Sequence, residues 1–133
     1  MKMLLPQEIQ ANYVLPALRR ELALALIDQR KLKQGDAAAL LGVTSSAISQ
    51  YRSAKRGGTL KFGDEILEEI SISSKKLEKG TSEPLQELLR LLNLPRAFDI
   101  VCNIHKKDDP RAENACAGCH IAPENRSVEE NND

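Results

Sequence analysis

Residues 34–56 (QGDAAALLGVTSSAISQYRSAKR) constrain the fold more than any other part of the chain. Apolar residues at helical spacing predict two short helices, over residues 33–41 and 45–55. Gly42 lies between them, where the chain must turn sharply, and glycine adopts a positive φ at little cost. Thr44 can cap the second helix, because its side-chain oxygen can accept a hydrogen bond from an unpaired amide of the first turn. The pattern predicts two helices held at a fixed angle.

The second predicted helix has a polar and basic outer face. Ala47, Ile48 and Tyr51 are expected in the core, and the serines and Gln50 between them are expected to be exposed. Serine and glutamine can reach base edges, and arginine and lysine suit phosphates. This favours a helix-turn-helix whose second helix enters a major groove over an ordinary amphipathic pair joined by a glycine turn. The candidate DNA-binding residues are Gln34, Thr44, Ser45, Ser46, Ser49, Gln50, Arg52, Lys55 and Arg56.

The same stretch resembles the helix-turn-helix of XRE-type, phage-repressor-like transcriptional regulators. The matching positions are Gln34, Ala38, residues 41–44 (LGVT), residues 47–49 (AIS) and Tyr51. Together with residues 13–22 (YVLPALRREL), the motif is similar to predicted archaeal regulators with a Cys-containing C-terminal segment. The resemblance covers residues 5–56, about two fifths of the chain, and is looser beyond them. It implies a sequence-specific DNA-binding transcriptional regulator.

Charge is unevenly distributed along the 133-residue chain. Its 19 basic and 19 acidic residues cancel, yet residues 1–63 hold ten basic and four acidic side chains, and residues 64–133 hold nine and fifteen. The N-terminal half therefore has the sign that suits a polyanion. No apolar run reaches the roughly 18 residues of a membrane span. The start, MKMLLPQEIQ, is too short for a secretory signal, so a cytoplasmic location is expected.

Helical periodicity continues on both sides of the motif, and no stretch predicts a convincing strand. Asp64 and Ser82 are the expected caps of two later helices, and Gly80 is the expected stop between them. The predicted fold class is an all-α bundle of five or six helices that contains a helix-turn-helix, with a short Cys/His-rich C-terminal segment. The further predicted helices span residues 7–14, 16–29, 65–79, 83–93 and 96–107.

The chain divides by composition into four segments. Residues 1–63 are the expected helix-turn-helix DNA-binding domain, and residues 64–95 a helical dimerisation and packing segment. Residues 96–120 form the expected Cys/His metal-binding segment, and residues 121–133 a polar, disordered tail.

Leucine-rich residues 83–93 have an apolar surface too wide for one narrow face. Such a surface suits either a buried helix or the seam of a homodimer. On the second interpretation, Asp in place of Leu88 or Leu92 is expected to give a monomer.

The second motif is Cys102-x2-His105-x10-Cys116-x2-Cys119-His120. Ligands two residues apart can bind one ion from one short turn, and two such pairs complete a tetrahedral site. Cys102 and His105 would lie one helical turn apart on the same face. An odd number of cysteines in a cytosolic chain argues against a disulfide framework. The candidate metal ligands are Cys102, His105, Cys116 and Cys119, with His120 as the alternative fourth ligand.

Four interpretations of this cluster stay open. A structural zinc site with three Cys and one His is favoured by ligand type and spacing. An iron–sulfur cluster comes second and would make the protein a redox or iron sensor. The third interpretation is a set of reduced, unliganded cysteines. The fourth is c-type haem, because residues 116–120 read Cys-Ala-Gly-Cys-His, although a five-residue motif often arises by chance.

The sequence does not favour an enzyme. No HxE or HExxH pattern accompanies the possible zinc ligands, and Gly57-Gly58 lacks the lysine and hydroxyl of a phosphate-binding loop at the required spacing.

The alternative to a regulator is an antitoxin-like protein-interaction module that also binds DNA and neutralises a partner through its acidic C-terminal half. Double-stranded DNA and a second copy of the chain are thus the expected partners. The operator, the effector and the sense of regulation stay open.

Overall fold

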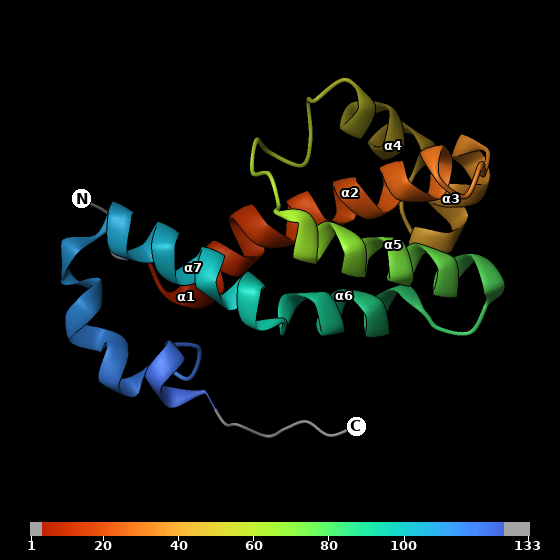
Figure 1. Cartoon of the computed structure of the whole chain (residues 1–133). Helices are drawn as coiled ribbons and strands as arrows, with labels where there is room; N and C mark the ends of the chain where they lie inside the picture. Colours follow the sequence, from red (N-terminus) through yellow and green to blue (C-terminus); the bar gives the residue numbers. More distant parts are fainter. Residues whose placement is uncertain (1–3, 127–133) are drawn as a thin grey trace.

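The computed structural model of the chain describes residues 4–126, apart from the side chains at positions 113, 115 and 117. This part is helical and contains no strand, which confirms the predicted all-α class. None of its helices is both long enough and apolar enough to cross a membrane. The α-helices are α1 Pro6–Ile9, α2 Leu15–Asp28, α3 Gln34–Leu41, α4 Ser45–Arg52, α5 Asp64–Lys79, α6 Pro84–Leu92 and α7 Pro95–Asp108 (Figure 1).

The N-terminal helices form one rod that runs through Pro16. The sequence predicts two separate helices here, with Pro16 at the first position of the second, where its missing amide costs little. Inside a continuous helix a proline lacks an amide hydrogen, and its ring clashes with the carbonyl four residues earlier. Instead, a π-helical turn, η1 (Gln10–Val14), joins α1 to α2. Its hydrogen bonds span five residues, which widens the helix. This local widening lets the rod continue past Pro16 into α2.

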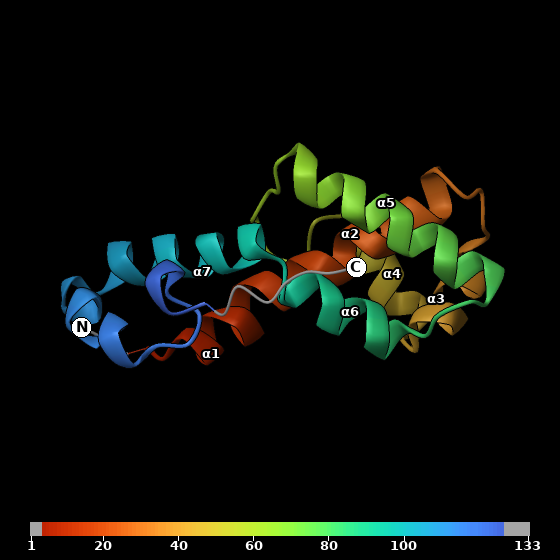
Figure 2. The same ribbon diagram turned by 60° about the horizontal axis from the view of Figure 1, so that its bottom comes forward.

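Helix α2 lies at the centre of the core. Leu18, Leu22 and Leu26 are fully buried, which confirms the predicted apolar stripe. The helix contacts α3, α4, α5 and α6, and both ribbon views show α5 alongside it (Figures 1 and 2). Residues 1–63 and residues 64–95 therefore contribute to one hydrophobic core.

The chain turns between α3 and α4 at Gly42. This glycine has a φ of 69°, in the left-handed region, and ends α3. The Thr44 hydroxyl oxygen accepts a hydrogen bond from the Ala47 amide at 3.0 Å and caps α4. Both roles agree with the sequence prediction. Ile48 and Tyr51 are buried, as predicted, so α4 is held against α2 and α3.

Arg20 of α2 holds the loop that joins α4 to α5. Its Nη1 donates to the carbonyl oxygens of Gly57 and Gly58, both at 2.9 Å, and its Nη2 donates to the carbonyl of Leu60. Gly57 has a φ of +92°, and a Cβ atom there would lie 2.7 Å from the Cβ of Arg20. Glycine is therefore required at position 57 both by backbone conformation and by space. The sequence predicts the loop but not this buried clamp.

Helices α5 and α6 begin differently from the prediction. Asp64 is the first residue of α5, and Gly63 holds the cap position without a side-chain bond. Ser82 does not cap α6, which begins at Pro84. Its hydroxyl donates instead to the Glu87 carboxylate at 2.6 Å. Gly80 ends α5 with a φ of 75°, as predicted.

A buried polar network joins α5 to α6 around Glu87. The Glu87 carboxylate accepts hydrogen bonds from Ser73 at 2.6 Å and from Arg90 at 3.2 Å, besides the bond from Ser82. Arg90 also donates to Glu69 and to Ser73. Burial raises the pKa of Glu87, but these hydrogen bonds outweigh burial and hold the pKa below its ordinary value. The carboxylate is therefore stabilised in its charged form.

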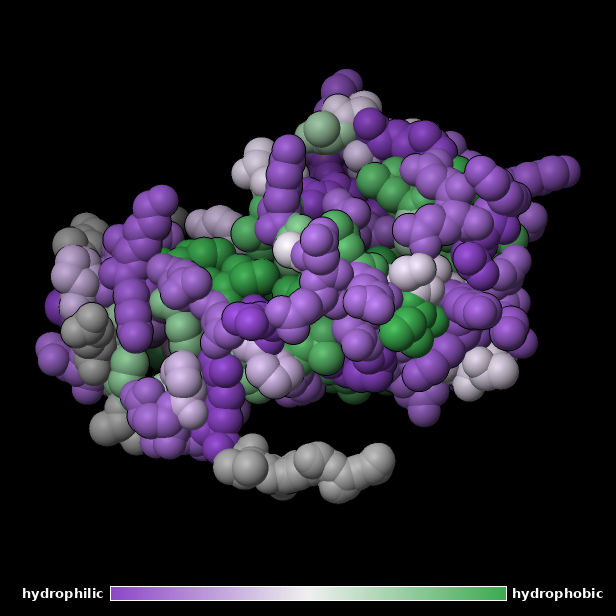
Figure 3. Space-filling view, viewed as in Figure 1, coloured by the Kyte–Doolittle hydropathy of each residue, from purple (hydrophilic) through white to green (hydrophobic). Residues whose placement is uncertain are grey.

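The leucines of α6 form a buried set and an exposed set. Leu91 is fully buried, and Leu88 and Leu92 are half-buried against the core. Leu85 and Leu89, one helical turn apart, expose 69% and 51% of their surface. Asp at position 88 or 92 would thus place a charge against the core and disturb folding. These two substitutions are therefore unsuitable for testing whether the chain forms a dimer. On the face in Figure 3, hydrophobic side chains reach the surface as separate patches among hydrophilic ones.

The chain folds back after α7. Asp109 accepts a hydrogen bond from the Arg111 amide at 3.0 Å, and two 3₁₀ helices follow, η2 (Pro110–Gly118) and η3 (Pro123–Asn125). Ile121 and Ala122, in the segment expected to be a disordered tail, are buried. Residues 127–133 of that tail lie outside the described residues. The folded-back segment lies at the same end of the molecule as α1 (Figures 1 and 2).

Candidate functional site

Helix α4 carries five of the nine candidate DNA-binding residues. Ser45, Ser46, Ser49 and Arg52 are exposed, and Gln50 is half-buried. The helix ends at Arg52 and not at residue 55 as predicted. Lys55 and Arg56 therefore lie in the loop that follows. Both are exposed, and their amides donate to the carbonyl of Gln50 at 2.8 and 3.2 Å.

Gln34 and Thr44 make contacts within the helix pair. The Gln34 side-chain amide donates to the Ser49 hydroxyl at 2.7 Å and to the Ser45 carbonyl at 3.0 Å. It thus links the start of α3 to the exposed face of α4. The Thr44 hydroxyl is occupied by its capping bond. The structure thus gives both residues a role in positioning α4. The sequence predicts this capping role for Thr44, but it indicates Gln34 only as a DNA contact.

Arg52 forms an ion pair with Asp28, at the end of α2. The guanidinium and carboxylate atoms are 3.0 Å apart, and both side chains are exposed. An exposed pair of this kind contributes only about 0–1 kcal/mol. Arg52 can therefore exchange the carboxylate for another anion, such as a phosphate, at small cost.

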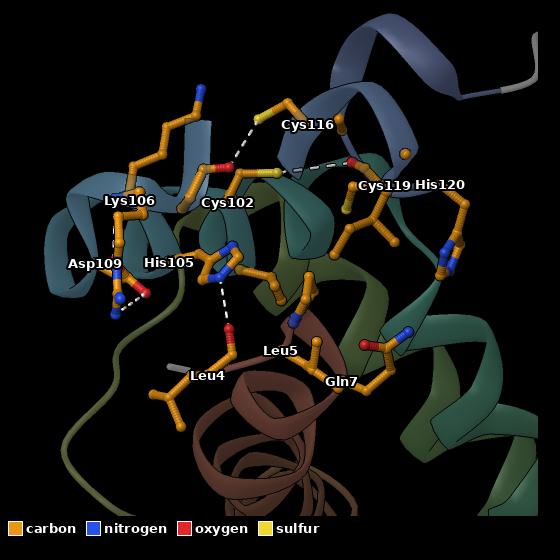
Figure 4. Close-up of a pocket in the computed structure, with 17 residues that line it drawn as sticks. Leu4, Leu5, Gln7, Cys102, His105, Lys106, Asp109, Cys116, Cys119 and His120 are labelled. Carbon is orange, nitrogen blue, oxygen red and sulfur yellow. Dashed lines mark hydrogen bonds and ion pairs between the residues drawn. The ribbon is translucent and has the colours of Figure 1, made fainter. Parts of the chain in front are cut away.

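The Cys/His motif lines a second candidate site, a pocket of about 380 Å³. Its walls come from the N-terminal residues, α7 and the folded-back segment after α7 (Figure 4). Val101, Ile121 and Ala122 give it an apolar floor. The predicted ligands that line it are Cys102, His105, Cys116, Cys119 and His120.

The three thiols are free and half-buried. Cys102 donates to the Ile121 carbonyl, and Cys116 to the Ala112 carbonyl, each at 3.7 Å from sulfur to oxygen. Burial raises the pKa of the Cys102 thiol above its ordinary value, and the positively charged Arg126 nearby opposes part of this rise. Hydrogen bonds from a thiol are weak, so both sulfurs can turn away from these carbonyls at small cost.

The two candidate histidines differ in their surroundings. His105 is half-buried on α7, and its Nε2 lies 2.6 Å from the carbonyl oxygen of Leu4. His120 is exposed. Among the described residues, no three His, Cys, Asp or Glu side chains lie close enough together to hold one ion. The pocket thus gathers the predicted ligands without bringing them to bonding distance of one point.

Two further residues position this pocket. The Asn125 side-chain amide donates to the carbonyls of Cys116 at 2.6 Å and of Cys119 at 3.0 Å. Leu4 supplies the carbonyl that meets His105. Neither residue carries a sequence signal, because both contacts depend on how distant parts of the chain fold together.

Comparisons with protein families, with curated proteins and with solved structures find no match for this chain.

Proposed function

We propose that the protein is a sequence-specific DNA-binding transcriptional regulator of XRE type, and that α3, Gly42 and α4 act as its helix-turn-helix. In this proposal α4 enters the major groove of double-stranded DNA. Ser45, Ser46, Ser49 and Gln50 read base edges, and Arg52, Lys55 and Arg56 bind phosphates. Gln34 and Thr44 support the reading helix.

The observation that carries the proposal is the two-sided character of α4. Its apolar residues are buried against α2 and α3, while four polar or basic side chains on its other side are exposed. A helix of that kind can enter a groove without losing its contacts with the core. The Thr44 cap and the Gln34 bonds to Ser45 and Ser49 hold the helix in one position. A fixed position favours base reading, because direct readout depends on hydrogen-bond geometry.

Selection of bound duplexes from a random pool, followed by salt-dependent binding to the enriched sequence, tests this function. Arg52→Ala and Lys55→Ala should weaken binding to all duplexes and flatten the salt dependence by about one charge each. Gln50→Ala should instead cost about 1–3 kcal/mol at its own base pair, because a glutamine side chain can form two hydrogen bonds with one adenine. Lys75→Ala, an exposed lysine on α5, is the matched control and should leave binding unchanged. No enrichment, or equal effects of Lys75→Ala and Lys55→Ala, would contradict the proposal.

We propose further that the regulator acts as a homodimer through the outer face of α6. One helix-turn-helix reads only a few base pairs, so two copies about one helical turn apart, roughly 34 Å, give useful specificity. Leu85 and Leu89 are large, adjacent on the helix and more than half exposed. A second copy of the same face would bury them.

The C-terminal segment is proposed to bind a metal, with zinc preferred to an iron–sulfur cluster. Support comes from the pocket, which gathers three cysteines and two histidines from α7 and the residues after it. Metal analysis of protein purified without oxygen tests this. A colourless protein with one zinc fits the preferred form, and a brown one fits the cluster. Replacing both Cys116 and Cys119 with Ser should abolish binding, and full metal content in that variant would contradict the assignment.

A further inference from the structure

His105 is tied to the N-terminal segment through one of its two ring nitrogens. Its Nε2 lies 2.6 Å from the carbonyl oxygen of Leu4, 101 residues away in the sequence. A carbonyl oxygen can only accept a hydrogen bond, so Nε2 must carry the hydrogen. In a neutral imidazole the other nitrogen, Nδ1, then has the free lone pair. The contact with Leu4 thus fixes which atom of His105 can bind a metal.

The free nitrogen faces the cysteines. Figure 4 shows the His105 ring between Leu4 on one side and Cys102 and Cys116 on the other. One nitrogen meets the Leu4 oxygen, and the other lies on the side of the two sulfurs. His120 lies apart from this group in the same view and is exposed. The geometry therefore favours His105 over His120 as the fourth ligand.

Histidines that bind metals commonly donate their second ring N–H to a backbone carbonyl, which fixes the tautomer and makes the ligand more basic. The Leu4 carbonyl stands in that position. We propose that Cys102, Cys116, Cys119 and Nδ1 of His105 bind one zinc ion, and that the Leu4 carbonyl is part of the site. Since the described side chains do not converge on one point, binding requires the thiols to turn from their carbonyl partners toward the ion. Each thiol loses its proton to solvent on binding. This inference rests on the proposed metal-binding function and adds the ligand atom and the N-terminal segment.

Zinc loading and docking of the N-terminal segment should stabilise each other. A metal bound to Nδ1 draws electron density from the ring, so the Nε2 hydrogen becomes a stronger donor to Leu4. By linkage, the docked segment then strengthens zinc binding by the same factor. Residues 5–9 should become more ordered together when zinc binds, because the amides of Glu8 and Ile9 donate to the Leu5 carbonyl at the start of α1.

Zinc affinity of the full-length reduced protein, measured against a coloured chelator, is the first test. His105→Ala should weaken binding about tenfold or more. His120→Ala is the matched control and should bind as the wild type does. Unchanged binding by His105→Ala, or an equal loss in His120→Ala, overturns the ligand assignment while zinc binding itself stands. Failure of the wild-type protein to bind zinc overturns both this inference and the proposed metal site.

Two further measurements each include the wild-type protein, whose result does not depend on the folding of a variant. Nitrogen NMR of the imidazoles should show zinc on Nδ1 of His105 with Nε2 protonated, and zinc on Nε2 would overturn the assignment. Hydrogen exchange of residues 5–9 should slow when zinc is added to the wild type and to His120→Ala, but not to His105→Ala. Equal exchange with and without zinc in the wild type would overturn the coupling to the N-terminal segment.

Discussion

Replacing Arg20 with Ala should loosen the loop that leads out of the proposed DNA-reading helix. The Arg20 guanidinium donates hydrogen bonds to the carbonyls of Gly57, Gly58 and Leu60. The substitution therefore leaves all three carbonyls without this donor. The loop connects α4 to α5. Its loss of order should therefore affect both the stability of the fold and the position of Lys55 and Arg56.

The expected cost follows from which acceptors water can reach. A hydrogen bond to a charged group contributes about 1.5–3 kcal/mol. Gly57 is buried, so the loss of the bond to its carbonyl should cost that full free energy. Gly58 is exposed and Leu60 is half-buried, so water can replace much of the other two bonds. Packing of the Arg20 methylene groups is lost as well. Together these give a destabilisation of about 2–4 kcal/mol.

Urea unfolding monitored by circular dichroism gives the measurement. The Arg20→Ala midpoint should fall while the slope stays constant, as for a pure change in stability. Arg19→Ala is the matched control, because Arg19 is the half-buried neighbour on α2 and donates to none of the three carbonyls. Its cost should stay below about 1 kcal/mol. Equal free energies of unfolding for the two variants would refute the clamp.

Three further outcomes follow from the structure. Gly57→Ala should lower the free energy of unfolding in urea more than Gly58→Ala does. A positive φ costs either variant about 1–2 kcal/mol, but only the Cβ at position 57 would also clash with Arg20. Equal free energies of unfolding for the two variants would contradict that clash. The pKa of Glu87 is held below its ordinary value in the folded protein. The charged Glu87 therefore stabilises the fold at pH values above the ordinary pKa, and this stabilisation is lost as pH falls through the lowered folded-state pKa. Urea unfolding between pH 6 and about 3 should show this loss in the wild type and less of it in Glu87→Gln; identical pH profiles would exclude the effect. Leu85→Asp with Leu89→Asp should leave the helical circular dichroism unchanged and give a monomer by sedimentation at micromolar concentration, whereas a wild-type monomer under the same conditions would refute the dimer.

Features that depend on neighbouring residues could be predicted from the sequence. The turn at Gly42 and the cap at Thr44 obey rules that act within four residues, and both are confirmed. The apolar stripe of α2 follows from helical periodicity alone. The caps of α5 and α6 were less predictable, because the Ser82 hydroxyl bonds to Glu87 instead of an amide at the start of α6.

Features that join distant parts of the chain could not be predicted. Arg20 and Gly57 lie 37 residues apart, and nothing local marks this arginine as buried. Glu87 is a charged residue in a leucine-rich helix, and only the folded arrangement of Ser73 and Arg90 makes its burial tolerable. In the Cys/His pocket the spacing of the motif indicates the candidate ligands, but the choice between His105 and His120 depends on the Leu4 carbonyl.

The two proposed sites lie near opposite ends of the rod formed by α1, η1 and α2 (Figure 1). For zinc to change DNA affinity tenfold, about 1.4 kcal/mol of coupling must pass along this rod, through an element with two arrangements. Helix α2 is a poor candidate, because Leu18, Leu22 and Leu26 are fully buried and close-packed cores resist deformation. We therefore expect the metal to act as a clasp. A chelator should speed hydrogen exchange in residues 4–9 and 110–126, while DNA affinity changes less than about tenfold. A larger change, together with altered exchange in residues 10–14, would instead identify the π-helical turn η1 as a switch between the two sites.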